Sequence, residues 1–375
     1  MKKQKVCIIT SVHPPLDQRI FYKQAISLKK AGYDVTLVGP YEEGIKIEEI
    51  KYIPLKKQRN RVLRILKTTR DAARKSLKIN PDIIHLHDPE LLLAVPYIRK
   101  IKGDKLKIIF DIHENVPAQI KGKEWIPAVL RNSISRIYKV IEGHYIKMID
   151  QLIIAEESYF ELYKNQNNVT LIRNSPLLIN KQKETMEKIN DLVYIGSISE
   201  QRGIFEMIKA VKYLKDSDYH VRLDVVGRVT VGAKNIEKAI NTSGVSGNIN
   251  MLGYVPILEA YKILWKSKVG LSLVHHQENH LKSNLVKLFD YMNAGIPIVA
   301  SNLPATKELV EGNKCGIVVD PFNTNQVAES IKFLLNNPKK AKELGDNGRE
   351  AVRKYFNWPL EEKKLLDLYK KIIQY

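Results

Sequence analysis

Residues 18–39 read QRIFYKQAISLKKAGYDVTLVG and decide the fold, because they join an amphipathic helix to a buried strand. We expect the helix to end at Gly32, since glycine is a natural C-cap residue. The β-branched runs 6–10 and 34–39 on either side are typical of strands that are covered on both faces of a sheet. A strand, a helix and a second strand in this order predict a parallel α/β unit. The apolar face of the helix consists of Phe21, Ala25 and Leu28.

The same alternation of short strands and helices recurs along the chain. Between residues 173 and 190 it breaks, because this stretch is polar and contains proline, which predicts a linker between domains. We expect a doubly wound α/β domain over residues 1–175, a linker over 176–189 and a second Rossmann-like domain over 190–358. The expected strands are 6–10, 34–39, 82–87, 107–112 and 151–155 in the first domain, and 191–196, 222–227, 250–253, 269–274, 297–301 and 316–320 in the second.

The last segment, 359–375, is rich in Leu, Lys and Glu and predicts a terminal helix. We expect this helix to return and pack on the first domain. Sheets of this kind bind ligands beyond the carboxyl ends of their strands, so the sequence predicts two Rossmann-like domains that face each other across a cleft.

The composition fits a protein of two globular domains. With 375 residues, 44% of them hydrophobic and 27% charged, the chain is long enough for two cores and too hydrophobic to be disordered. The apolar run 6–10 is too short for a signal-peptide core, and no stretch approaches the roughly 20 apolar residues that a membrane span needs. Cys7 and Cys315 lie in separate strand-like contexts, which disfavours a disulfide or a metal cluster. We therefore expect a cytoplasmic protein.

The formal net charge is +20, and the densest basic segment, Lys56–Lys78, holds ten basic residues against Asp71 alone. This pattern predicts a helix that lies on an anionic membrane surface, at the inner membrane face. The alternative is an ordinary surface helix whose apolar stripe faces its own core. We expect no nucleic-acid partner, because no recognised nucleic-acid module accompanies the charge. The stripe consists of Val62, Ile65, Leu66, Ala73 and Leu77, and Arg61, Arg64, Arg70, Arg74 and Lys78 occupy much of the rest.

The most specific signal is the segment 287–301, KLFDYMNAGIPIVAS. It closely resembles the K-x-F-E-Y-M-x-x-G-x-P-[VI]-[VI]-A-[ST] segment of the family 4 glycosyltransferases, which have the GT-B fold. The resemblance spans nearly the whole chain. The other segments that match the family, in the same order as in its members, are 13–20, 85–89, 111–114, 194–197, 202–203, 315–321, 348–352 and 355–358.

The resemblance implies a retaining glycosyltransferase, which moves a hexose-type sugar from a nucleotide-diphosphate donor to a hydroxyl acceptor. It implies front-face departure and attack, with the leaving phosphate helping to deprotonate the acceptor. We expect a UDP-sugar as donor, and neither a metal nor another cofactor. Together with the basic N-terminal half, the resemblance suggests the assembly of a cell-surface polysaccharide or glycolipid on a lipid-linked or polysaccharide acceptor.

The second domain offers the groups that a sugar diphosphate needs. A helix that starts near Asn284 presents free N–H groups and the positive end of its dipole to the phosphates. Arg202 and Lys287 are suited to neutralise the charge that builds on the leaving phosphate, and they are the expected catalytic cations. Asp290 lies one turn beyond Lys287 and can accept hydrogen bonds from the ribose, although the family usually has Glu there. The expected donor-binding residues are Gly196, Ser197, Ser283, Asn284, Leu285 and Asp290.

His113 ends a strand of the first domain, where the family carries a histidine near the donor sugar. It is the third expected catalytic residue, and the alternative is a structural role. His85 and His87 alternate along a strand, and we expect their rings to point to opposite faces, so that they form no metal site. The expected acceptor-side residues are Asp17, Arg19, His87 and Asp88.

Two positions depart from the family pattern. Many members have two glutamates eight positions apart, but the first falls on Lys282 here, so the segment supports no carboxylate nucleophile. Many members also place an arginine where this chain has Ser197. The D-x-D sequence of Asp216–Asp218 lies in a polar turn between a helix and a strand, and turn chemistry accounts for it without a metal.

Two other functions stay open at this point. A sugar-nucleotide 2-epimerase shares the two-domain fold but needs acid–base carboxylates, and residues 287–301 resemble the transferases more closely. A non-enzymatic polyanion-binding protein is compatible with the net charge, and its binding would depend steeply on salt.

Overall fold

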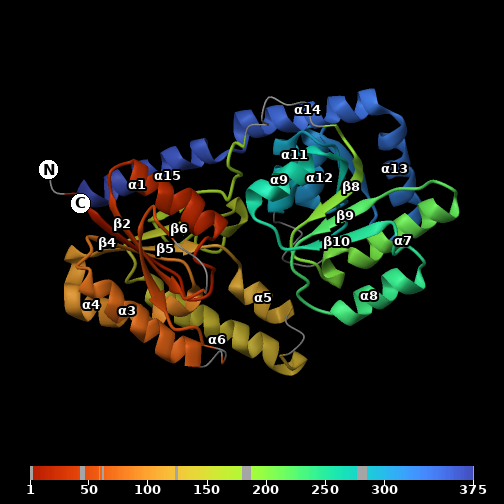
Figure 1. Cartoon of the computed structure of the whole chain (residues 1–375). Helices are drawn as coiled ribbons and strands as arrows, with labels where there is room; N and C mark the ends of the chain where they lie inside the picture. Colours follow the sequence, from red (N-terminus) through yellow and green to blue (C-terminus); the bar gives the residue numbers. More distant parts are fainter. Residues whose placement is uncertain are drawn as a thin grey trace. The chain divides into compact units, whose positions relative to one another are not determined.

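The computed structural model describes residues 3–42, 47–58, 60, 63–122, 126–179, 187–276 and 285–374. The chain forms two compact units (Figure 1). The N-terminal unit comprises Met1–Asn174 and Trp358–Tyr375, and the C-terminal unit comprises Ser175–Asn357. Each unit is a parallel sheet with helices, which confirms the predicted fold class.

The described part of the N-terminal unit contains a seven-stranded sheet in the order β3-β2-β1-β4-β5-β6-β7. β1 pairs in parallel with both β2 and β4, so the strand order reverses beside β1, and this is where sheets of this type bind ligands. The sequence predicted five of these strands and missed β3 and β7, which lie at the two edges. The strands are β1 (Lys5–Ile9), β2 (Asp34–Pro40), β3 (Lys51–Leu55), β4 (Ile83–Leu86), β5 (Lys107–Ile112), β6 (Gln151–Ile154) and β7 (Val169–Leu171).

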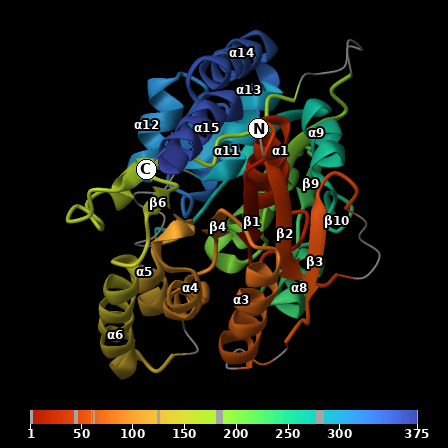
Figure 2. The ribbon, with the colours of Figure 1, turned by 90° about the vertical axis from the view of Figure 1, so that its left-hand side faces the viewer.

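Helices cover both faces of this sheet. Figures 1 and 2 show α1 and α15 on one side of it and α3 and α4 on the other. The helical segments are η1 (Gln18–Ala25), α1 (Ile26–Lys30), η2 (Arg64–Thr68), α3 (Thr69–Lys78), η3 (Pro89–Ala94), α4 (Val95–Lys102), η4 (Gly103–Lys105), α5 (Val116–Gly122), α6 (Ala128–Ile146), η5 (Glu157–Tyr159) and α15 (Trp358–Gln374).

The terminal helix α15 returns to the N-terminal unit, as predicted. The indole Nε1 of Trp358 donates a hydrogen bond to the Ser27 hydroxyl at 2.9 Å. One face of α15 is buried, and the Tyr369 hydroxyl lies 2.8 Å from Nδ1 of His85 in β4. The helix is therefore part of the core of this unit.

The basic segment Lys56–Lys78 includes η2 and α3, and its apolar stripe fits the alternative of an ordinary surface helix. Ala73 is buried in the core of the unit, and Leu77 is half-buried against the same core, whereas Leu66 is 63% exposed. The stripe therefore faces mainly inward, because α3 packs with small residues on its own sheet. Arg61 and Val62 lie outside the described residues.

The described part of the C-terminal unit contains a six-stranded parallel sheet in the order β10-β9-β8-β11-β12-β13, and all six strands were predicted. Its strands are β8 (Asn190–Ile195), β9 (Leu223–Val226), β10 (Ile249–Gly253), β11 (Ser267–Ser272), β12 (Ile298–Ser301) and β13 (Gly316–Val319). Its helical segments are η6 (Glu200–Arg202), α7 (Ile204–Asp216), α8 (Ala233–Thr242), α9 (Ile257–Trp265), α11 (Val286–Ala294), α12 (Pro304–Gly312), α13 (Thr324–Asn336) and α14 (Pro338–Tyr355).

Tyr291 fixes α11 to the centre of this sheet. Its hydroxyl donates to the carbonyl oxygen of Leu271 in β11 at 2.9 Å and accepts from the amide of Ile195 in β8 at 3.0 Å. The ring lies against Gly270, where a Cβ atom would come within 2.7 Å of it. Two adjacent strands and one glycine thus determine where the first turn of α11 lies.

Gly203 determines where α7 begins. This N-cap residue has a φ of +81°, and a Cβ atom on it would lie 1.9 Å from the carbonyl oxygen of Leu273. Only glycine accepts both the left-handed backbone and this close contact.

We predict that Gly203→Ala destabilises the C-terminal unit far more than Gly244→Ala does. Gly244 has a similar φ of +67° but has no atom within 4 Å of the added Cβ, so it isolates the backbone cost of about 1–2 kcal/mol. Gly203→Ala adds a backbone clash and should cost at least about 3 kcal/mol in the free energy of unfolding. Urea unfolding of both variants measures the difference, and equal losses would contradict the prediction.

Candidate functional site

The motif residues of the C-terminal unit gather at the carboxyl end of β8. Gly196 and Ser197 follow this strand directly, and Arg202 closes the short helix η6 after them. Lys287 lies in the first turn of α11, and its side chain reaches the same place. A Cβ atom on Gly196 would lie 3.3 Å from Cε of Lys287. The backbone of Gly196 therefore lies close to the lysine side chain.

The side-chain amine of Lys287 is buried. The residue is 8% exposed, and its Nζ donates to the Tyr194 hydroxyl at 2.7 Å and lies 3.9 Å from the centroid of that ring. Among the described residues, no carboxylate forms an ion pair with Lys287. Burial and then the positive charge of Arg202 lower the pKa of Lys287 well below its ordinary value. The arrangement favours the arrival of an anion, which would restore the ammonium form.

Tyr194 holds Lys287 in place. Its hydroxyl donates to the carbonyl oxygen of Ser197 at 2.6 Å, so it meets Lys287 as an acceptor. Burial raises the pKa of Tyr194, which therefore stays a neutral phenol and does not neutralise the lysine. Apart from its place in the 194–197 motif, no sequence pattern indicated a role for Tyr194.

Asp290 lies one turn beyond Lys287 and is 5% exposed. Its Oδ1 accepts a hydrogen bond from the Tyr261 hydroxyl at 2.9 Å. Asn293 donates to the same hydroxyl at 2.9 Å, so the carboxylate is oriented by a small network. Sequence reasoning missed Tyr261 and Asn293, because neither belongs to a pattern that indicates a ligand.

The start of α11 is only partly described. Leu285 is the N-cap residue, with an extended backbone at φ −70° and ψ 122°, and the helix runs from Val286. Ser283 and Asn284 lie outside the described residues.

The N-terminal unit brings a second group together at the carboxyl ends of β1, β4 and β5. The loops after these strands carry His13, His87 with Asp88, and His113. Asp111 lies beneath them in β5 and is fully buried. These strands are neighbours in the sheet, so residues from three separate motifs meet there.

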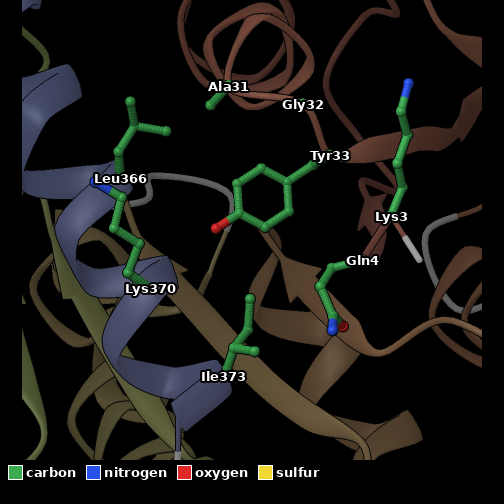
Figure 3. A pocket seen from close by; sticks show the side chains of 8 residues that line it. All are labelled: Lys3, Gln4, Ala31, Gly32, Tyr33, Leu366, Lys370 and Ile373. Atoms are coloured by element: carbon green, nitrogen blue, oxygen red, sulfur yellow. The ribbon is translucent and has the colours of Figure 1, made fainter. Parts of the chain in front are cut away.

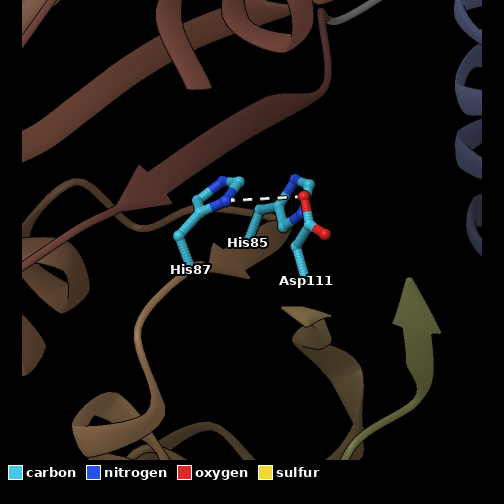
Figure 4. A group of neighbouring side chains, drawn as sticks. All are labelled: His85, His87 and Asp111. Atoms are coloured by element: carbon cyan, nitrogen blue, oxygen red, sulfur yellow. Dashed lines mark ion pairs between the residues drawn. The ribbon is translucent and has the colours of Figure 1, made fainter. Parts of the chain in front are cut away.

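His85 and His87 lie on the same face of the sheet, and the prediction of opposite faces was wrong. Residues two apart in a strand point to the same side. Their rings stack with centroids 4.4 Å apart (Figure 4). Burial lowers the pKa of His85 to about 4 and that of His87 well below its usual value, so both rings are neutral.

His85, His87 and Asp111 offer ligand atoms that lie within 4.8 Å of one another, as a metal site would require (Figure 4). The carboxylate of Asp111 is already bound: Arg19 donates to its two oxygens at 2.9 and 2.8 Å, and Gln24 donates at 2.7 Å. A divalent cation would have to sit beside the Arg19 guanidinium. The contacts therefore fit a buried ion pair beside two neutral histidines better than a metal site.

Asp111 also fixes the proton of His113. Nε2 of His113 lies 3.3 Å from Oδ2 of Asp111 and 3.1 Å from Nδ1 of His87. Although burial alone would raise it, the pKa of Asp111 is held well below its ordinary value, chiefly by Arg19, so this carboxylate can only accept. His113 must carry a hydrogen on Nε2, and in its neutral form Nδ1 is an acceptor.

His13 and Asp88 form an ion pair with 2.8 Å between Nδ1 and Oδ1. Burial opposes the charge on His13, but the hydrogen bond and charge of Asp88 raise its pKa to about 9. Burial also opposes the charge on Asp88, yet His13, Ser11 and Thr10 lower its pKa to about 2. The pair is thus ionised at neutral pH, and the His13 side chain is 32% exposed.

Two family models match this chain. The model described as "Glycosyltransferase Family 4" matches residues 18–171, and "Glycosyl transferases group 1" matches residues 178–351. Together they cover most of both units. The chain belongs to the GT-B glycosyltransferases.

Individual relatives are distant. Glycogen synthase of Mycobacterium tuberculosis is 22% identical over 74% of this chain and 66% of its own length. The capsular polysaccharide biosynthesis glycosyltransferase CapM of Staphylococcus aureus is 22% identical over 67% of this chain and 66% of its own length. The match therefore spans about two thirds of the length of these relatives.

Solved structures of this fold cover the whole chain. Sucrose-phosphate synthase of Thermosynechococcus elongatus superposes with a TM-score of 0.77 at 18% identity, covering 99% of this chain and 100% of its own. Alr3699/HepE of Anabaena in complex with UDP-glucose gives a TM-score of 0.74 at 12% identity, covering 98% and 99%. At such identities the likeness shows the GT-B fold.

Two of the expected acceptor-side residues of this glycosyltransferase-family chain have internal roles. Asp17 caps η1 by accepting from the amides of Arg19 and Ile20 at 2.8 and 2.9 Å. Arg19 is 3% exposed and bonds to Asp111 and to the carbonyl oxygen of Ile172. Arg19 is thus turned inward, whereas Asp17 is half-buried and caps a helix.

Two other features lie away from these groups. Asp216 ends α7 and pairs with Lys212, while Asp218 lies in the following turn with its side chain almost fully exposed, so the D-x-D sequence is at the amino end of the sheet. A surface hollow of about 310 Å³ between Gly32, Tyr33 and α15 lies at the amino end of β1 (Figure 3). It contains none of the motif residues.

We predict that His13→Gln flattens the dependence of stability on pH. The pKa of His13 rises from 6.5, the ordinary value of the unfolded chain, to about 9 in the fold. The ion pair therefore stabilises fully below pH 6.5 and is lost as the pH rises through 9. The wild-type midpoint in urea should fall more than that of the variant over this range. His144→Gln, an exposed histidine on α6, is the control. Parallel pH profiles for wild type and His13→Gln would show that His13 is not charged.

Proposed function

We propose that this chain is a retaining glycosyltransferase that moves a hexose-type sugar from a UDP-sugar to a hydroxyl acceptor. The observation that carries the proposal is the buried amine of Lys287 beside Arg202 at the carboxyl end of β8, with which no carboxylate of the described residues forms an ion pair. A sugar nucleotide supplies the missing negative charge through its diphosphate. The UDP-glucose bound to Alr3699/HepE, a protein of the same fold, supports the choice of donor.

The donor lies, in this proposal, against the C-terminal unit. The diphosphate meets Lys287, Arg202 and the start of α11, and the ribose bonds to the carboxylate of Asp290. The remaining donor contacts are assigned to Gly196, Ser197, Ser283, Asn284 and Leu285.

The cations carry the main catalytic work. As the bond between the sugar and the phosphate breaks, negative charge grows on the leaving diphosphate, and Lys287 and Arg202 stabilise it in a site of low dielectric. This role replaces a metal ion, so we expect activity in EDTA. The leaving phosphate then takes the proton of the acceptor hydroxyl, and the anomeric configuration is kept.

The N-terminal unit is assigned the acceptor. Nδ1 of His113 accepts a hydrogen bond from a sugar hydroxyl, because Asp111 holds the hydrogen on Nε2. On the acceptor side we retain His87, which positions His113, and Asp88, which positions His13. We add the partly exposed cation of His13 itself. The acceptor is a polysaccharide or a lipid-linked glycan, which the likeness to the capsular glycosyltransferase CapM supports.

An epimerase receives less support from these contacts. It needs carboxylates that exchange protons with a sugar, whereas Asp88 and Asp111 are held in ion pairs and Asp290 accepts from Tyr261. Formation of a 2-epimer from a UDP-sugar without any acceptor would favour it over transfer.

We place the enzyme in the cytoplasm, at the inner membrane face. Cys7 and Cys315 are free, buried thiols, which fits a reducing compartment. In the part of the chain that the structure describes, no helix is long and apolar enough to cross a membrane.

We predict that Lys287→Met separates function from stability. It keeps the volume of the buried stem but removes a charge that is costly to bury, so the free energy of unfolding should stay equal or rise. Turnover should fall about 10²–10³-fold, and the rise of the melting temperature with UDP should shrink. Arg202→Ala should also lower turnover.

The control is Lys238→Ala, which removes an exposed lysine of α8 in the same unit. It should leave turnover and the UDP-induced shift unchanged. A full UDP shift in Lys287→Met, or a shift that EDTA abolishes in wild type, would contradict the proposed donor site.

A further inference from the structure

The outer face of α6 is apolar. This helix of 19 residues buries only a narrow stripe that includes Ser135, Glu142 and Ile146. Figure 2 shows α6 at the outer side of the N-terminal unit. Six large aliphatic side chains point away from the core: Val129 (85% exposed), Leu130 (48%), Ile134 (38%), Ile137 (59%), Val140 (70%) and Ile141 (43%).

These six side chains form one continuous strip. At 100° per residue they fall on an arc of roughly 140°, on the side of the helix opposite the buried stripe. Single exposed aliphatic residues are ordinary, but a contiguous strip on one helix marks a surface that binds something apolar. The apolar side chains of α6 thus lie mainly on its outward face, because Ser135 and Glu142 are among the few residues that it buries.

The charges around the strip are positive. In residues 128–148 the exposed charged side chains are Arg136, Lys139 and Lys147. The one acid of this stretch, Glu142, is buried and accepts from the hydroxyls of Tyr138 and Tyr163 at 3.0 and 3.2 Å. The exposed surface of α6 therefore carries cations and aliphatic groups but no anion.

We propose that this face of α6 docks on an anionic lipid bilayer. A strip of Val, Leu and Ile can enter the boundary between headgroups and acyl chains, while the flanking cations meet lipid phosphates. A second copy of the chain fits less well. A two-fold interface would bring Arg136, which borders the strip, close to the same residue of the copy, and like charges repel.

The basic segment Lys56–Lys78 adds to the same surface. α3 and α6 both pack against η3, whose Leu93 is 41% exposed. The exposed cations of this segment include Lys67, Arg70 and Arg74. Its apolar stripe faces mainly inward, so in this proposal it contributes attraction to the lipid and α6 contributes insertion.

The inference is independent of the chemistry at Lys287, because it concerns where the chain is held. Its test is sedimentation of the full chain with vesicles of phosphatidylcholine, with or without about 30 mol% phosphatidylglycerol. The apolar variant is Val129→Gln/Ile137→Gln/Val140→Gln, and the charge variant is Arg136→Glu/Lys139→Glu. All five positions are exposed, so the melting temperature and the UDP-induced shift should not change.

Two matched controls lie on the C-terminal unit. Val231→Gln/Leu258→Gln removes aliphatic groups that are 71% and 61% exposed, and Lys234→Glu/Lys238→Glu reverses two exposed charges of α8.

Wild type and both controls should bind the anionic vesicles, less at high salt. The apolar variant should lose at least about five-fold in partitioning, and the charge variant should lose the preference for anionic lipid.

Three results would overturn the proposal. One is wild type that does not prefer anionic vesicles. Another is an apolar variant that sediments like wild type. The third is a wild-type dimer that the apolar variant abolishes in the absence of vesicle binding, which would make the strip an interface between copies. If UDP does not raise the melting temperature but vesicle binding is normal, the result counts only against the proposed transferase function.

Discussion

Burying a lysine amine without a carboxylate disfavours its charged form, and the described part of the C-terminal unit holds Lys287 in this setting. The hydroxyl and ring of Tyr194 contact Lys287, but they carry no negative charge that would balance an ammonium. Tyr291 anchors α11 to β8 and β11, so Lys287 cannot swing out to solvent without moving a helix. Burying Lys287 without a carboxylate lowers the stability of the free protein. In the proposed function, a bound diphosphate removes this cost and so binds more tightly.

In the N-terminal unit, by contrast, the buried charge has a partner: the carboxylate of Asp111 is paired with Arg19. Arg19 binds both oxygens of Asp111, and this pair lies at the centre of the histidine cluster. Asp111 in turn sets which nitrogen of His113 faces outward. A buried carboxylate thus acts through a neighbour, and the His113 side chain presents Nδ1 beside the cation of His13.

The repeating pattern of strands and helices was enough to predict the fold, since buried parallel strands are continuous apolar runs. It missed β3 because this edge strand is exposed or half-buried over its first four residues and contains a proline. At the site, the motifs indicated Lys287 and His113 but not their partners. Arg19 was assigned to the acceptor, and its bond to Asp111, 92 residues away, has no local signal. The prediction that His85 and His87 point to opposite faces was wrong, because side chains two residues apart in a strand lie on the same face.

The most direct test of the account counts the protons that are taken up when UDP binds. Burial and Arg202 lower the pKa of Lys287, and a bound diphosphate raises it, so binding at about pH 8.5 should draw protons onto this amine. Calorimetry in buffers of different ionisation enthalpy gives their number at saturating UDP. The account predicts that wild type takes up more protons than Lys287→Met and that the difference grows with pH. Equal uptake by the two proteins at every pH would contradict it.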